Sequence, residues 1–168
     1  LSIFDFLLDD LPESVSCIGS CKLDEKVEDT SYTTFKYPKN ILAHAHASWL
    51  NPRKVRQITV IGDRKMAIWD DLNLEHPIMI YDSSIGLEQS YYSDSFASHR
   101  LSYNRGAVVL PPISTNEPLL EEMNHFIKVL RGGVENRCSG KYATEVVKSL
   151  VHADQSLQSR GVFIKIKR

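Results

Sequence analysis

Long apolar runs, a strong excess of charge and paired cysteines are all missing from this sequence. No stretch approaches the roughly 20 apolar residues that cross a bilayer, so we expect no membrane partner. The 168 residues carry 20 basic and 21 acidic side chains, a formal net charge of -1, which gives no electrostatic case for nucleic acid. The three cysteines are an odd number, which predicts reduced thiols and a cytoplasmic location rather than a disulfide framework.

Motifs for phosphate binding and for nucleophilic catalysis are absent as well. The sequence contains neither the glycine-rich turn of dinucleotide-binding domains nor the phosphate loop of nucleoside triphosphatases. No serine lies in the context of a nucleophile elbow. We therefore expect no dinucleotide or nucleotide site within this chain by the usual routes.

Alternating residues dominate the segment from Glu28 to Asp71. Turn signals at 38–40, 51–52 and 62–63 divide it into four runs of strand-forming residues. Strand side chains alternate between faces, so odd positions from Ile41 to Trp49 share one face and even positions from Leu42 to Leu50 the other. This pattern predicts one broad, open, largely antiparallel (mixed) sheet.

The rest of the chain predicts helices around that sheet. Helices are expected at residues 1–11, from Pro118 to Gly132 and from Ser139 to Gly161, with further strands at 15–23, 78–81, 107–110 and 162–167. Residues 82–102 are polar and show no regular hydrophobic periodicity, which predicts an irregular loop. The apolar positions expected to be buried are Leu119, Leu120, Met123, Phe126, Ile127 and Leu130 in the second helix, and Ala143, Val146, Val147, Leu150, Val151 and Leu157 in the third.

Segregated strands and helices predict an α+β fold in a single domain spanning residues 1–168, with helices packed on one face of the sheet. Ala43, Ala45 and Ala47 mark the helix-covered face, because small side chains let helices approach closely. The opposite face also carries apolar residues. We expect that face to pair with a second copy of the chain, giving a homo-oligomer.

His44 and His46 are the most suggestive pair for a metal, because residues two apart on a strand share a face. A zinc site needs four ligands, and Asp70, Asp71 and His76 are not placed by any recognisable spacing. A histidine pair within a sheet face or at a subunit contact is therefore favoured. We predict no metal site.

Two short basic segments are candidates for holding a phosphate or carboxylate. Arg53, Lys54 and Arg56 follow Trp49 at a predicted strand end, and Tyr103 and Arg105 follow the predicted loop. A solvated strand end is the alternative for both segments, since charged side chains usually face water.

The run ILAHAHASWLNPRKVRQITVIGDRKMAIWDDL, residues 41–72, resembles the C-terminal domain of the Gfo/Idh/MocA oxidoreductases. It is most similar to members linked to nucleotide-sugar or amino-sugar metabolism. The supporting residues are Ser48-Trp49, Pro52 to Arg56, Ile61-Gly62, Met66-Ala67, Glu117 to Leu119, Phe126 and the run LSIFDFLL at the start of the chain. The resemblance covers nearly the whole chain.

The resemblance implies a two-domain enzyme that transfers hydride at a sugar hydroxyl carbon. An upstream Rossmann domain would bind NAD or NADP, and this domain would supply the substrate side and the oligomer contacts. The first residue is Leu, and no N-cap precedes the apolar stripe of residues 1–11, which predicts a chain cut from something longer. The family's Glu-Lys-Pro motif is missing, and its assisting histidine would lie just upstream of Leu1. We therefore expect no catalytic residue in this chain.

Trp49, Arg53, Lys54, Tyr103 and Arg105 remain the candidate substrate residues. Ala107 stands where relatives often have an acid, which is a departure close to Tyr103 and Arg105. The first hypothesis is thus a substrate-binding and oligomerisation domain, inactive in isolation. The alternatives are a non-enzymatic assembly module that pairs through its open sheet face and, less favoured, a metal-dependent enzyme that uses His44 and His46.

Overall fold

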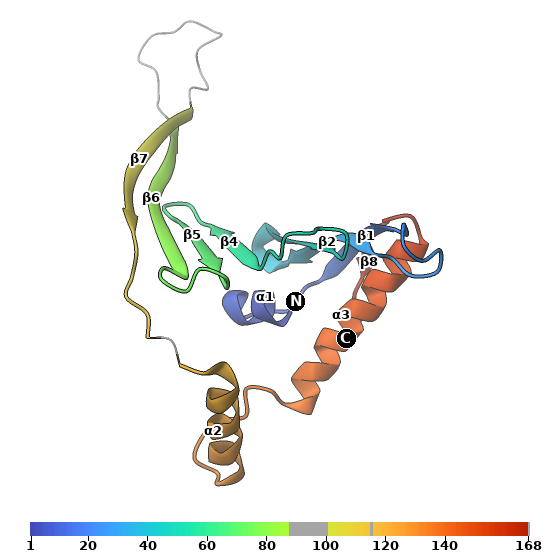
Figure 1. Ribbon diagram of the computed structural model, residues 1–168. Coiled ribbons are helices and arrows are strands. Elements are labelled where there is room, and N and C mark those ends of the chain that lie inside the picture. Colours follow the sequence, from blue (N-terminus) through green and yellow to red (C-terminus); the bar gives the residue numbers. More distant parts are fainter. Residues whose placement is uncertain (88–100, 115, 168) are drawn as a thin grey trace, which may run out of the picture. The chain divides into compact units, whose positions relative to one another are not determined.

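The computed structural model describes residues 1–87, 101–114 and 116–167, without the side chains of residues 83–87 and 101–105. The chain divides into two compact units (Figure 1). The first unit contains Leu1–Pro52 and Glu122–Arg168, and the second contains Arg53–Glu121.

The first unit is built on a four-stranded antiparallel sheet in the order β3-β2-β1-β8. Its strands are β1 (Ser14–Ser20), β2 (Thr30–Tyr37), β3 (Ile41–Ser48) and β8 (Ile164–Lys165). A short 3-10 turn, η1 (Pro38–Asn40), joins β2 to β3 at the predicted turn. The final strand is shorter than predicted, with only two residues paired to β1.

The second unit contains an antiparallel sheet in the order β4-β5-β6-β7. Its strands are β4 (Gln57–Ile61), β5 (Met66–Asp70), β6 (Ile78–Leu87) and β7 (Leu101–Val109). The α+β fold with open antiparallel sheets is confirmed, and the four predicted strands are β2 to β5. The prediction of one broad sheet is wrong, because the strands form two sheets: β3 ends at Ser48 in the first, and β4 begins at Gln57 in the second.

Part of the predicted irregular loop is strand. β6 continues to Leu87 and β7 begins at Leu101, with a register shift between Tyr81 and Ser83. Backbone hydrogen bonds can hold a two-stranded ladder without side-chain alternation, which is why the pattern did not predict it. Residues 88–100 of that predicted loop lie outside the described residues.

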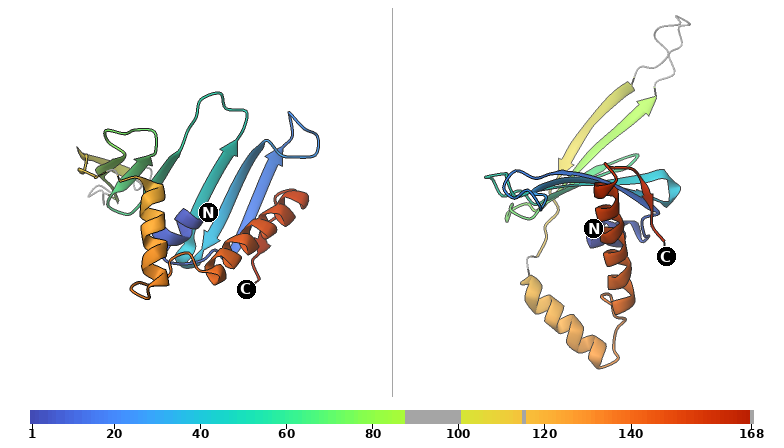
Figure 2. Two further views of the ribbon diagram at one scale, coloured as in Figure 1. Left: turned by 60° about the horizontal axis from the view of Figure 1, so that its bottom comes forward. Right: turned by 90° about the vertical axis from the view of Figure 1, so that its right-hand side faces the viewer.

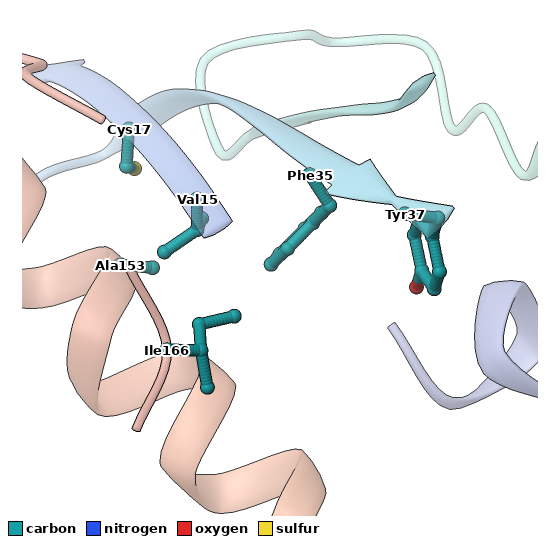
Figure 3. Packing of buried hydrophobic residues seen from close by; sticks show 6 residues of the cluster. All are labelled: Val15, Cys17, Phe35, Tyr37, Ala153 and Ile166. Atoms are coloured by element: carbon teal, nitrogen blue, oxygen red, sulfur yellow. The ribbon is translucent and has the colours of Figure 1, made fainter. Parts of the chain in front are cut away.

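The core of the first unit lies between its sheet and the helices α1 (Ser2–Leu8) and α3 (Gly140–Gln158), which lie on the same side of the sheet (Figure 2). The buried apolar side chains come from β1, β2, α3 and the C-terminal segment (Figure 3): Val15, Cys17, Phe35, Tyr37, Ala153 and Ile166. Leu1 and the α1 residues Phe4 and Leu8 pack against them, as does Ala43 of β3. The predicted helix-covered face of β3 is therefore confirmed at Ala43.

Helix α3 begins and ends where predicted, but it buries a different face. Ser139 caps it by accepting the N–H of Tyr142 over 3.2 Å, and Gly161 follows it with a φ of 83°. Its buried residues are Ser149, Ala153 and Ser156. Four members of the predicted stripe are exposed: Ala143, Val147, Leu150 and Val151. Small side chains let α3 lie close to β1, and a search for apolar periodicity does not find serine or alanine at these positions.

Helix α2 (Pro118–Leu130) also has its predicted bounds, and Gly132 follows it with a φ of 71°. The predicted buried face is not buried, because every residue of this helix is at least partly exposed. Among the described residues, no helix is long and apolar enough to span a membrane.

Candidate functional site

Trp49 follows β3 in the first unit, and its indole is 86% exposed. The backbone at this position is well held. Its N–H donates to the Asp29 carbonyl over 2.8 Å, and the hydroxyls of Ser48 and Thr30 lie 2.8 Å apart. Ser48 also accepts the N–H of Leu50 over 3.2 Å. The structure thus presents a large aromatic surface from a fixed strand end.

Asp29 lies immediately before β2 and is 7% exposed. Its Oδ2 accepts the N–H groups of Lys22 and Leu23 over 2.5 and 2.7 Å. Its Oδ1 is buried and has no hydrogen-bond partner among the described residues. This carboxylate therefore holds the start of the β1–β2 loop through one oxygen and leaves the other unsatisfied.

The surroundings of Asp29 affect the nearby thiol of Cys21. Burial raises the pKa of Cys21, and the carboxylates of Glu28, Asp29 and Asp24 raise it further, because negative charges disfavour the thiolate. Sequence reasoning missed Asp29. Its only sequence signal is an acid directly before a strand, which is too common to single it out.

The predicted basic residues Arg53 and Lys54 lie at the start of the second unit and are both exposed. Arg56 Nη1 forms an ion pair with Asp71 Oδ2 at 3.1 Å. That pair is exposed, so its contribution to stability is small. Arg56 is therefore engaged with a carboxylate of its own unit.

Tyr103 and Arg105 lie in β7, where their backbones pair with Ile85 and Ser83. Their side chains lie outside what the structure describes. Of the five candidate substrate residues, Trp49 belongs to the first unit and the other four to the second.

His44 and His46 lie on the exposed face of the first sheet, packed around Tyr32. The Tyr32 ring stacks on His46 with centroids 4.4 Å apart and planes at 9°, and it lies 6.3 Å from the His44 ring. His44 Nδ1 is 3.2 Å from the Thr34 hydroxyl. No group of three or more His, Cys, Asp or Glu residues in the described part of the chain could hold a metal ion.

A polar cluster, buried at Asp5 and Tyr37, joins three elements of the first unit. The Tyr37 hydroxyl of β2 donates to Asp5 Oδ1 of α1 over 2.6 Å, and Asp5 is 4% exposed. The Tyr142 hydroxyl of α3 donates to the Ser2 carbonyl over 3.1 Å. Burial, and then Asp5, raise the pKa of both tyrosines. Sequence reasoning missed this cluster, whose one local signal is an acid within an apolar helical stripe.

Comparison with known proteins places part of the chain in a family. A family model described as the GFO/IDH/MocA C-terminal domain matches residues 1–68, which include α1, the strands β1 to β4 and Trp49. Residues 1–68 belong to this family of oxidoreductase domains. The resemblance inferred from the sequence is thereby confirmed. A search of curated proteins found no match.

Solved structures share the fold over nearly the whole chain. UDP-N-acetylglucosamine 3-dehydrogenase GnnA from Acidithiobacillus ferrooxidans is 12% identical with a TM-score of 0.72, covering 95% of this chain and 44% of its own. The WlbA dehydrogenase from Bordetella pertussis, in complex with NADH and UDP-GlcNAcA, is 16% identical with a TM-score of 0.64, covering 99% and 42%.

An NAD-binding protein from Listeria innocua is 20% identical with a TM-score of 0.68, covering 98% of this chain and 44% of its own. At these identities the likeness shows the fold alone. The chain spans less than half the length of these solved proteins.

Proposed function

We propose that this chain is the substrate-binding and oligomerisation domain of an NAD(P)-dependent oxidoreductase that acts on a sugar or nucleotide-sugar hydroxyl. The family match over residues 1–68 carries the proposal. Its support is a fold shared with dehydrogenases whose names include UDP-N-acetylglucosamine and UDP-GlcNAcA. A cytoplasmic location remains a prediction.

The cofactor would be NAD or NADP, bound by a separate domain upstream. This chain has no glycine-rich dinucleotide turn, so its own residues would serve the sugar rather than the dinucleotide. The cofactor would supply hydride transfer, and this domain would bind and orient the substrate and exclude water. On this proposal the chain alone turns over no substrate.

Substrate contacts would come from the exposed residues Trp49, Arg53 and Lys54, with Tyr103 and Arg105 as further candidates. Arginine and lysine side chains suit the phosphates of a sugar nucleotide, arginine through two parallel hydrogen bonds. Charge removal at Lys54 should raise the Michaelis constant for the sugar nucleotide. An unchanged constant would exclude this residue from the site.

Oligomerisation would use the face of the first sheet that lies opposite its core. The strand register places hydroxyl and imidazole side chains there together with Ile18, Tyr32 and Leu42, which are 56%, 42% and 62% exposed. Sheet-to-sheet pairing would remove those side chains from water. Leu42→Asp should lower the mass in sedimentation velocity, while Leu74→Asp, exposed in the second unit, should not.

The proposed reaction is tested by reading the open reading frame upstream of Leu1 and assaying the full-length product. We expect about 120 to 150 upstream residues, which is the length of a Rossmann domain. We also expect the full-length product to reduce NAD or NADP only in the presence of a sugar nucleotide. The chain alone should be inactive. An open reading frame without such a domain, together with a chain that assembles but binds no sugar nucleotide, would favour the assembly module instead.

A further inference from the structure

The exposed Trp49 indole and the buried Asp29 carboxylate are parts of one arrangement. The Asp29 carbonyl holds the Trp49 backbone, and the Asp29 carboxylate holds the β1–β2 loop beside it through two N–H groups. One aspartate therefore connects the end of β3 to the loop before β2. Both residues belong to the first unit.

Neither half of this arrangement favours folding by itself. An indole that is 86% exposed buries little of its apolar surface. A buried carboxylate oxygen without a partner within the described residues works against stability, and such exceptions in native structures need an explanation. A ligand that covers the indole would explain why a rigid strand end presents it.

We propose that Trp49 is a stacking platform for a ring of the nucleotide-sugar substrate and that Asp29 is the residue that positions it. This role rests on the proposed function, which supplies the ligand class. A flat π-surface binds the face of a base or the apolar face of a pyranose. Because the backbone is held before the ligand arrives, less conformational freedom is lost on binding.

The two tryptophans of the chain allow a direct optical test. Trp69 lies half-buried in β5, so Trp69→Phe leaves Trp49 as the sole tryptophan. Titration of this variant with UDP-N-acetylglucosamine should change the Trp49 fluorescence with saturation. UDP alone reproduces the change if the base stacks, and N-acetylglucosamine alone reproduces it if the pyranose stacks.

Affinity measurements on variants of the whole chain decide whether the stacking matters. Trp49→Ala should weaken binding of UDP-N-acetylglucosamine about tenfold or more, as for loss of one stacked base. Trp49→Phe keeps a ring and should lose less. Calorimetry that finds equal affinity for the wild-type chain and Trp49→Ala overturns the stacking role and leaves the proposed function standing. A wild-type chain that binds none of the three compounds overturns the proposed substrate class and the stacking role together.

The positioning role of Asp29 needs a readout that stability alone would not move. In the Trp69→Phe background, Asp29→Ala should lower the fluorescence anisotropy of Trp49 and weaken binding, while Asp29→Asn keeps an oxygen acceptor and should restore both. Asp24→Ala is the matched control, because Asp24 accepts the Lys26 N–H in the same loop and the change removes that acceptor. If Asp29→Ala changes only the free energy of unfolding, Asp29 does not position Trp49.

Discussion

Replacing Tyr37 by phenylalanine removes one hydroxyl from the buried contact between α1 and β2. In the native structure that hydroxyl donates to Asp5 Oδ1 over 2.6 Å, and the two residues are 2% and 4% exposed. Water cannot easily take the place of the lost donor. A hydrogen bond to a charged group contributes about 1.5–3 kcal/mol, so Tyr37→Phe should lower the free energy of unfolding by about 2 kcal/mol.

The same strand supplies a matched control. Tyr32 also lies in β2, but on the exposed face, where its ring stacks on His46. Tyr32→Phe keeps that ring and should change the free energy of unfolding by less than about 0.5 kcal/mol, as is usual for a surface substitution. Both variants can be compared by urea unfolding, followed by circular dichroism and by hydrogen exchange of the β2 amides.

The outcome separates two explanations of the buried cluster. A loss near 2 kcal/mol for Tyr37→Phe alone would show that the hydroxyl, and not only the ring, holds α1 against the sheet. Equal and small effects for the two variants would refute the reasoning. In that case the Asp5 carboxylate would be satisfied by its other neighbours.

Three further predictions concern the first unit. Folding raises the pKa of Tyr37, so the contribution of the protonated hydroxyl to stability is complete below the ordinary pKa of 10 and is lost as the pH rises above it. Above about pH 9, the free energy of unfolding should therefore fall less steeply in Tyr37→Phe than in the wild type. Ser156→Ala removes the acceptor of the Cys17 N–H (2.9 Å) and the donor to the Val162 carbonyl (2.7 Å), and it should lower the free energy of unfolding in urea by about 2–4 kcal/mol. Ser149→Ala should lower it far less, because the Ser149 hydroxyl donates to the Glu145 carbonyl within the same helix. Gly161 has a φ of 83°, and a Cβ at this position would collide with Ile18 Cγ2, so Gly161→Ala should lower the melting temperature. Gly140→Ala should not lower it, because a Cβ there meets nothing within 4 Å. Equal melting temperatures for the two variants would contradict this prediction.

Strand and helix positions could be predicted from the sequence where the local signal is also the cause of the structure. Alternation and turn residues predict β2 to β5, because strand side chains alternate by geometry. Ser139 and Gly161 bound α3 because capping and a positive φ are local requirements. The division into two sheets could not be read in this way, since nothing local in the run after Ser48 shows where pairing stops.

Tertiary contacts between elements were the features that could not be predicted from the sequence. The buried face of α3 consists of Ser149, Ala153 and Ser156, which carry little apolar signal but allow close approach and a hydrogen bond to β1. Asp5 is buried and accepts a hydrogen bond from Tyr37, which is distant in sequence. Trp49 was singled out beside the basic segment, but its exposure and its connection to Asp29 required the structure.

The most direct test of the substrate-domain proposal is calorimetric titration of this chain with UDP-N-acetylglucosamine and, separately, with NADH and NADPH. The proposal predicts saturable binding of the sugar nucleotide with no tight binding of either dinucleotide. Tight, stoichiometric binding of NADH or NADPH, with no binding of the sugar nucleotide, would contradict it.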